Sequence, residues 1–169
     1  MRSSNEKTAI PRFPKLDFEG AAQTRDALHA YAGILGDWLK SCRRKRKHWW
    51  HASLRPSMAG LTTGVVHAGI DFELEIDLRA SRIIGRTSQG AQLIEAIDGQ
   101  SKVELAQEIS NFLTASGVED GLVPANKSQF SDRFAGYSAK HAQSLGRVLN
   151  DVSAAMAEFR AGIREETSP

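Results

Sequence analysis

The segment "KRKHWWHASL", residues 45–54, gathers the side chains of this chain that are best suited to chemistry. His48 and His51 have imidazoles that exchange protons near neutral pH and bind metal ions. Trp49 and Trp50 offer large apolar rings with one polar N–H each. If the segment is a strand, side chains one residue apart point to opposite faces, so the two histidines diverge and form no metal pair. We therefore expect no metal site here.

The two faces of this predicted strand differ in polarity. Trp50 belongs to the more apolar set, whereas Trp49 and His51 belong to the more polar one. We expect Trp50 to be nearly buried under a helix, with His48 near the edge of the same layer, and Trp49 and His51 to lie on the outer face. On this basis Trp50→Ala should cost about 3–5 kcal/mol and Trp49→Ala much less.

Three further polar side chains are candidates for a ligand site. His29 lies on a predicted helix with Gly33 and Gly36 at i+4 and i+7, a strip without bulk that lets the helix approach a sheet closely. An imidazole there is a candidate acid–base group, although a histidine satisfied by one hydrogen bond is commoner. Thr62 and Thr63 face opposite sides of a predicted strand, so only one of them can line the same cavity.

Known catalytic machinery is not indicated by any motif. The sequence contains no glycine-rich phosphate loop, no nucleophile elbow and no HExxH. The only cysteine is Cys42, which excludes an intramolecular disulfide and a cysteine-based zinc cluster within one chain. We therefore expect no cofactor.

Residues 43–47 are all basic and follow the end of the first predicted helix, where cations favour the helix dipole. The formal net charge of the chain is +2, so the other residues together carry −3. A nucleic-acid-binding domain is usually basic as a whole, which disfavours nucleic acid as a partner. A solvated run at a helix end is the preferred interpretation, and a contact with nucleic acid or an acidic partner is the alternative.

The clearest predicted strand is "IDFELEIDL", residues 70–78, which alternates strictly between apolar and acidic side chains. Its four carboxylates share one face, and Arg82 and Arg86 share a parity on the next predicted strand. Cross-strand ion pairs on a solvated face explain the acidic row better than acid–base or cation chemistry.

Around these side chains the pattern predicts one α+β domain over residues 1–169. A helix from about residue 17 precedes a five-stranded antiparallel meander over residues 48–97, which begins with HWWHASL, and two helices follow on the same face of the sheet. Ser101 and Glu104 form a capping box, Gly117 ends that helix, and a loop with Pro124 leads to the last one. Residues 1–15 are expected to be a mobile arm and residues 164–169 a frayed end.

The blocks "TRDALHAYAGILGDWLK", "HWWHASLRPSMAGLTTGVV" and "VELAQEISNFLTASGV" make the chain resemble a family of uncharacterised proteins grouped as a domain of unknown function. The likeness covers most of residues 16–169, and the HWWH and GLTT blocks are its most specific parts. It implies an α+β domain and names no activity. It also implies that certain positions matter in the family pattern: Thr24, Leu28, His29, His48, Trp49, Trp50, His51, Gly60, Leu61 and Thr62.

The chain departs from this family in two respects. Where members have a glutamine and a lysine on the first helix, it has Gly33 and Asp37. Members also continue beyond the "SP" of residues 168–169 into a histidine- and aromatic-rich segment and a second half. We expect any site shared with that half to be only partly present here, or to be completed by another chain.

Three functional hypotheses follow. The first is a soluble, cytoplasmic, non-catalytic module that binds a small ligand or a protein partner, including a second copy, through the outer sheet face around the HWWH strand. The second is an enzyme with His29 and His48 or His51 as acid–base groups in a pocket between the first helix and the sheet. The third is weak nucleic-acid binding through residues 43–47. No apolar run is long enough for a membrane span, so no membrane partner is expected.

Overall fold

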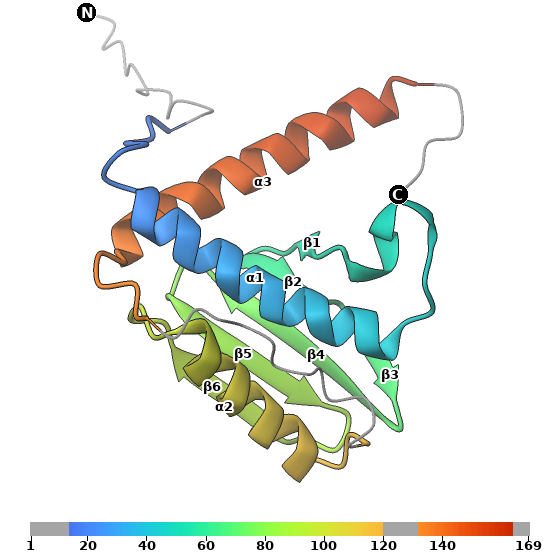
Figure 1. Cartoon of the computed structure of the whole chain (residues 1–169). Coiled ribbons are helices and arrows are strands. Elements are labelled where there is room, and N and C mark those ends of the chain that lie inside the picture. Colours follow the sequence, from blue (N-terminus) through green and yellow to red (C-terminus); the bar gives the residue numbers. More distant parts are fainter. Residues whose placement is uncertain (1–13, 120–131, 164–169) are drawn as a thin grey trace, which may run out of the picture.

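The computed structural model describes residues 14–119 and 132–163 (Figure 1). Helix α1 (Ala22–Cys42) is followed by the short 3₁₀ helix η1 (Lys47–Ala52), six strands, and helices α2 (Lys102–Ala115) and α3 (Ala139–Ala161). The strands are β1 (Arg55–Pro56), β2 (Gly60–Thr62), β3 (Val66–Ala68), β4 (Ile70–Asp77), β5 (Arg82–Thr87) and β6 (Gln92–Ala96). The loop at Pro124, the frayed end and nearly all of the mobile arm expected from the sequence lie outside the described residues.

The strands form one antiparallel sheet in the order β1-β2-β4-β5-β6, and β3 pairs with the same strand, β4, as β2 does. This confirms the predicted α+β meander. The residues that form its first strands differ from those predicted. HWWHASL is not a strand, and β1 begins only at Arg55; the block GLTTGVV is divided into β2 and β3 by residues 63–65.

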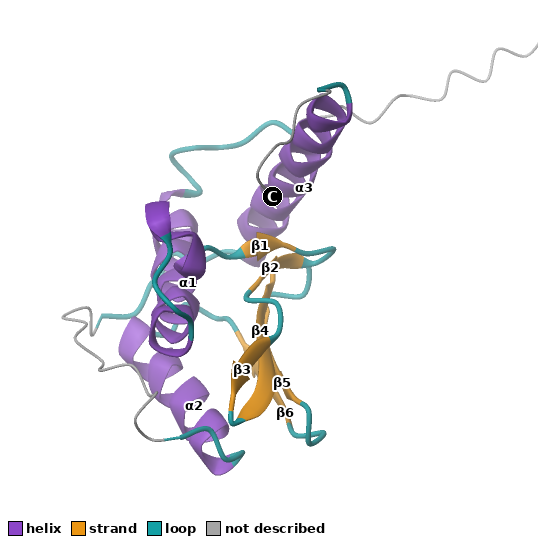
Figure 2. Ribbon diagram, turned by 90° about the vertical axis from the view of Figure 1, so that its right-hand side faces the viewer, coloured by secondary structure: helices purple, strands orange, loops and turns teal. Residues whose placement is uncertain are grey.

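Helices α1 and α2 lie over one face of the sheet (Figure 2). The apolar side chains of β4 point toward them, with Phe72, Leu74 and Ile76 at most 2 % exposed, as the alternating pattern predicts. Trp38 of α1 packs edge-on against Phe72, with ring centroids 5.9 Å apart and an interplanar angle of 80°. The fully buried residues of the two helices that complete this core are Ala27, Tyr31, Leu35, Leu39, Leu105, Ile109 and Leu113.

Helix α3 lies at the β1–β2 end of the sheet and packs through its first half (Figure 2). Ala142 is fully buried, and at Gly146 an added Cβ would lie 3.0 Å from the Cβ of Leu78, so the helix approaches this residue closely. The second half of the helix exposes large apolar side chains at Val152, Met156 and Phe159. No helix in the described part of the chain is long and apolar enough to cross a membrane.

The local signals that bound α2 are confirmed. The Ser101 hydroxyl accepts from the Glu104 N–H, and the Glu104 carboxylate accepts from the Ser101 N–H at 2.7 Å, which completes the capping box. These hydrogen bonds hold the pKa of Glu104 below its usual value. The helix ends at Ala115, and Gly117 follows with φ +94°, a conformation that glycine adopts without strain.

Trp38→Ala should lower the free energy of unfolding by about 3–5 kcal/mol, because it empties the contact between α1 and β4. Trp50→Ala is the matched control: this tryptophan is half exposed, so the same truncation should cost less than about 1 kcal/mol. Urea unfolding followed by far-ultraviolet circular dichroism measures both. A loss at Trp50 equal to that at Trp38 would contradict this core.

Candidate functional site

Residues 43–52, termed here the aromatic–basic segment, connect the end of α1 to β1. Arg43 takes an extended conformation, which ends α1, and its N–H donates to the Leu39 carbonyl at 2.9 Å. Its guanidinium reaches across to the link between β2 and β3 and donates to the carbonyls of Thr63 at 2.9 Å and Val65 at 3.1 Å. Burial, followed by the nearby Arg55 and Arg46, lowers the pKa of Arg43. This residue therefore anchors the segment, whereas residues 44–47 are exposed.

The backbone of η1 is unusual because two consecutive bulky residues have left-handed conformations. His48 has φ 55° and ψ 24°, and Trp49 has φ 60° and ψ 19°. Each such residue costs roughly 1–2 kcal/mol relative to a right-handed conformation. Clusters of strained residues of this kind occur preferentially at functional sites.

One side chain closes this turn from the inside. The backbone N–H of Arg46 donates to Nδ1 of His51 at 3.2 Å, and His51 is only 5 % exposed. Nδ1 is therefore the acceptor nitrogen of the neutral ring, and the proton is on Nε2. A local hydrogen bond between a side chain and the backbone competes with strand formation, and here it prevails over the strand preference of the tryptophans.

Both tryptophans lie on the surface. Trp49 is 59 % exposed and Trp50 51 % exposed. The Trp49 ring stacks on the His51 ring at 5.5 Å, the Lys45 ammonium lies 5.5 Å from the Trp49 ring centroid, and His48 lies 6.0 Å from the Trp50 ring. The segment thus presents two indoles beside exposed cations.

The strand-face prediction for this segment was wrong for two side chains. Trp50 is exposed rather than buried, and His51 is buried rather than exposed; Trp49 is exposed as predicted. The alternation fails because residues 47–52 form a helical turn, in which neighbours do not point to opposite faces. The expected cost of about 3–5 kcal/mol for Trp50→Ala rested on that burial and therefore loses its basis.

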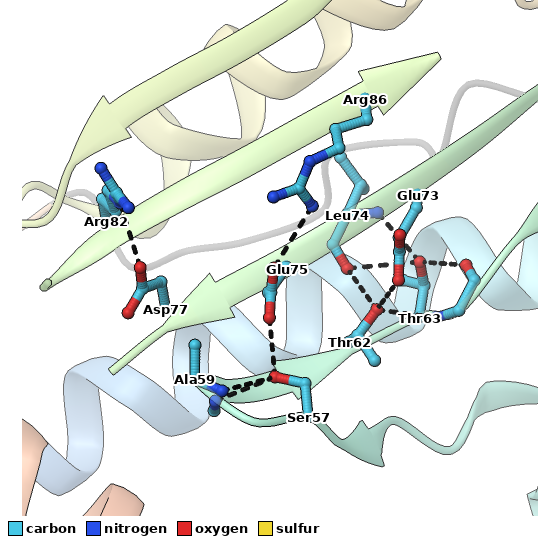
Figure 3. A network of polar contacts seen from close by, with 12 residues as sticks. Ser57, Ala59, Thr62, Thr63, Glu73, Leu74, Glu75, Asp77, Arg82 and Arg86 are labelled. Carbon is cyan, nitrogen blue, oxygen red and sulfur yellow. Dashed lines mark hydrogen bonds and ion pairs between the residues drawn. The ribbon is translucent and has the colours of Figure 1, made fainter. Parts of the chain in front are cut away.

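Thr62 and Thr63 hold the link between β2 and β3, and both hydroxyls lie 3.3 Å from the Leu74 carbonyl oxygen (Figure 3). They do not point to opposite faces as predicted, because β2 ends at Thr62 and the strand alternation stops there. Thr63 is fully buried: its N–H donates to the Leu74 carbonyl at 2.9 Å, and its hydroxyl accepts from the Leu74 N–H at 3.0 Å. The Thr62 hydroxyl donates to Glu73 at 2.6 Å and accepts from the Gly64 N–H at 2.9 Å. Both hydroxyls are therefore committed to the fold.

The acidic row of β4 forms cross-strand contacts, as the sequence predicts (Figure 3). Asp77 pairs with Arg82 at 3.0 Å, and Glu75 pairs with Arg86 at 3.3 Å. Glu75 also accepts from the Ser57 hydroxyl at 2.7 Å. No group of three histidine, cysteine or carboxylate side chains within residues 14–119 and 132–163 is placed to hold a metal ion.

His29 does not join the two histidines of η1. It is exposed on α1, near the start of the helix, while His48 and His51 follow the helix end about 20 Å further along, given a rise of 1.5 Å per residue. The glycine strip beside it meets neighbours other than the sheet. A Cβ at Gly33 would lie 3.6 Å from Nζ of Lys102, and one at Gly36 would lie 3.5 Å from the Ala52 carbonyl.

Other positions of the family pattern have structural roles. Thr24 is buried, and its hydroxyl accepts from the Ser138 N–H at 3.0 Å, which joins the starts of α1 and α3. At Gly60 an added Cβ would collide with the Ile76 carbonyl. The sequence analysis did not predict that Arg43 anchors the segment. The one local signal was Gly64, because a glycine inside a strand pattern often marks a break, and the carbonyls that Arg43 binds belong to the residues on either side of it.

The chain belongs to DUF5996, described as a family of unknown function, whose model matches residues 13–169. No curated protein and no solved structure matches the chain. The family therefore supplies membership and no chemistry, so a function has to be argued from the aromatic–basic segment itself.

Arg43→Ala should lower the free energy of unfolding by about 1–2 kcal/mol, because it removes two charge-assisted hydrogen bonds to carbonyls. Arg44→Ala removes the same charge from an exposed neighbour and should change stability by less than about 0.5 kcal/mol. Urea unfolding of the two variants provides the comparison. Equal losses would mean that the guanidinium of Arg43 does not anchor the segment.

His51 should carry its proton on Nε2 when neutral, because Nδ1 accepts the Arg46 N–H. Long-range ¹⁵N–¹H correlation spectra of the imidazole distinguish the two tautomers. His48, whose side chain lies on the exposed side of the turn, provides the internal reference. A spectrum that assigns the proton of neutral His51 to Nδ1 would show that this turn is closed in another way.

Proposed function

We propose that the chain is a non-catalytic binding module and that its aromatic–basic segment binds an acidic, partly apolar segment of a partner protein. The observation that carries the proposal is the pair of exposed tryptophans on a strained turn beside four exposed cations. Exposed tryptophans are enriched among the residues that dominate protein interfaces. The proposal moves the contact from the sheet face, where the sequence placed it, to the turn after α1.

The charge of this region favours an anionic partner. No acidic residue occurs in the sequence between Asp37 and Asp71, whereas this interval contains Lys40, the five basic residues 43–47 and Arg55. The four exposed cations, residues 44–47, are therefore not neutralised by neighbours in the sequence. Clustered charges of one sign attract oppositely charged partners and accelerate their association.

The strained backbone favours a preorganised contact. The left-handed conformations of His48 and Trp49 persist because Arg43 and His51 fix the two ends of the turn. A turn held in this way loses little conformational entropy when a partner binds, so more of the contact energy remains as affinity.

A protein partner is favoured over single-stranded nucleic acid by the state of the Trp49 ring. Base recognition by stacking needs a free aromatic face, but Trp49 already stacks on His51 and lies next to the Lys45 ammonium. The residues outside 43–47 carry a net charge of −3, so they would repel a nucleic acid that extends beyond the segment over the rest of the domain.

The enzyme hypothesis has less support. The region between α1 and the sheet, where its pocket was expected, is filled by Tyr31, Leu35 and Trp38, which are at most 1 % exposed. Burial also raises the pKa of the Cys42 thiol, which disfavours the reactive thiolate. His29, the first candidate acid–base group, is exposed on α1.

A fluorescein-labelled peptide of alternating glutamate and leucine residues tests this function by fluorescence anisotropy. Replacement of both Trp49 and Trp50 by alanine, and of Arg44, Lys45 and Arg46 by serine, should each weaken binding by at least about tenfold. The control replaces the exposed cations Arg79, Lys140 and Arg147 by serine, which gives the same change in net charge elsewhere. Its affinity should stay within about twofold of the unmodified chain.

A single-stranded oligonucleotide of equal charge is the competing probe. Tighter binding of the oligonucleotide than of the peptide, with a steep dependence on salt, would replace the proposed protein partner by nucleic acid. If the serine variant of Arg44, Lys45 and Arg46 and the control serine variant weaken peptide binding equally, net charge and not the aromatic–basic segment drives the contact.

A further inference from the structure

Strand β6 ends the strand order of the sheet, and one of its two edges has no partner strand among the described elements (Figure 1). The hydrogen bonds to β5 fix which residues point outward. Thr87 N–H donates to the Ala91 carbonyl and Ile97 N–H to the Ser81 carbonyl, so residues 91, 93, 95 and 97 face β5. Antiparallel pairing alternates, so the N–H and C=O groups of Gln92, Ile94 and Ala96 face the open edge.

This edge has few of the features that prevent strand pairing. Native edge strands are protected by proline, by charged side chains, especially lysine, by bulges or by a covering segment. β6 reads Gln-Leu-Ile-Glu-Ala: it has neither proline nor lysine, Glu95 is its one charged residue, and its central Ile94 is 59 % exposed. One outward group has a partner: the Ala96 carbonyl accepts from the Gln100 side chain at 2.6 Å.

The edge is complementary to a second copy of itself. A twofold axis at Ile94 places this residue opposite the partner's Ile94, and Gln92 opposite the partner's Ala96, so the outward groups of the two strands meet. Glu95 then lies opposite the partner's Leu93, and no two like charges face each other. A register with this symmetry uses the outward backbone groups of β6 except the Ala96 carbonyl, which accepts from the Gln100 side chain.

The side chains on the outer face favour the same register. Ile84 of β5 is the cross-strand neighbour of Ile94 and is only 7 % exposed. Pairing at Ile94 therefore lines up four isoleucines, two from each copy, and cross-strand β-branched pairs stabilise sheets. The flanking cations Arg82 and Arg86 are already paired with acidic residues of β4, so they do not repel the second copy.

We infer that the open edge of β6 binds a second copy of this chain in antiparallel register, which joins two sheets across a twofold axis at Ile94. This surface lies on a different element from the aromatic–basic segment, so the two contacts are independent. An isologous pair of this kind leaves both copies of the segment available.

Sedimentation velocity over a concentration series tests the inference. The unmodified chain should show concentration-dependent dimerisation, and Ile94→Lys should weaken it by at least about tenfold, because a cation at the centre of the pair repels its symmetry mate. Val65→Lys is the matched control: it adds the same charge at a residue that is 56 % exposed near the opposite edge, and it should leave dimerisation unchanged. Far-ultraviolet circular dichroism checks that both variants fold.

A chain that stays monomeric at the highest concentration would overturn the inference, and so would a dimer that survives Ile94→Lys. Cross-linking adds a geometric criterion in a Cys42→Ser background. Residues of a hydrogen-bonded antiparallel pair lie about 5.5 Å apart between Cα atoms, within the range for a disulfide. Ile94→Cys should therefore oxidise to a covalent dimer much faster than Val65→Cys; equal rates would exclude the twofold axis at Ile94.

Discussion

The interruption of the strand beside β4, at residues 63–65, is the constraint on which the candidate site depends. Here the Thr63 hydroxyl accepts the hydrogen bond from the Leu74 N–H that a backbone carbonyl of a continuous strand would accept. The Leu74 N–H therefore keeps a partner although the chain turns away from the sheet. The turn directs the carbonyls of Thr63 and Val65 toward α1, where the Arg43 guanidinium binds both. One buried threonine and one arginine thus determine where the chain leaves α1.

The position of the aromatic–basic segment follows from this anchor. With Arg43 and the buried His51 as fixed points, the residues between them form a short turn with two left-handed residues, which exposes both indoles. The polar outer face of the sheet offers no comparable set of unpaired charges, because its carboxylates are paired with arginines and hydroxyl groups within the described part of the domain. The exposed cations 44–47 therefore remain the charges best placed to meet a partner.

Patterns with one period over many residues predicted the fold well. The strict alternation of β4 identified its apolar buried face and the arginine pairs of its acidic face, although Asp77 on that face is only 5 % exposed, and the capping box located the start of α2. These features depend on local rules that neighbouring elements do not override. The sheet order followed because short connections favour antiparallel neighbours.

The candidate site was predicted in composition but not in conformation. HWWHASL has the composition of a strand, yet its shape is decided by a hydrogen bond from Arg46 to His51 and by the distant carbonyls that Arg43 binds. Neither contact produces a periodic pattern in the sequence. The predicted exposures of Trp50 and His51 were therefore the reverse of those in the structure. Gly64 was the one local signal that the strand before β4 is interrupted.

Fluorescence quenching of three single-tryptophan variants tests the central claim, that two tryptophans lie exposed on a positively charged turn. Each variant keeps Trp38, Trp49 or Trp50 and replaces the other two by phenylalanine. Iodide should quench Trp49 and Trp50 more strongly than caesium does, because cations 44–47 concentrate anions around them, and neither ion should quench the buried Trp38. A Trp50 as protected as Trp38, or equal quenching of Trp49 and Trp50 by the two ions, would contradict the account.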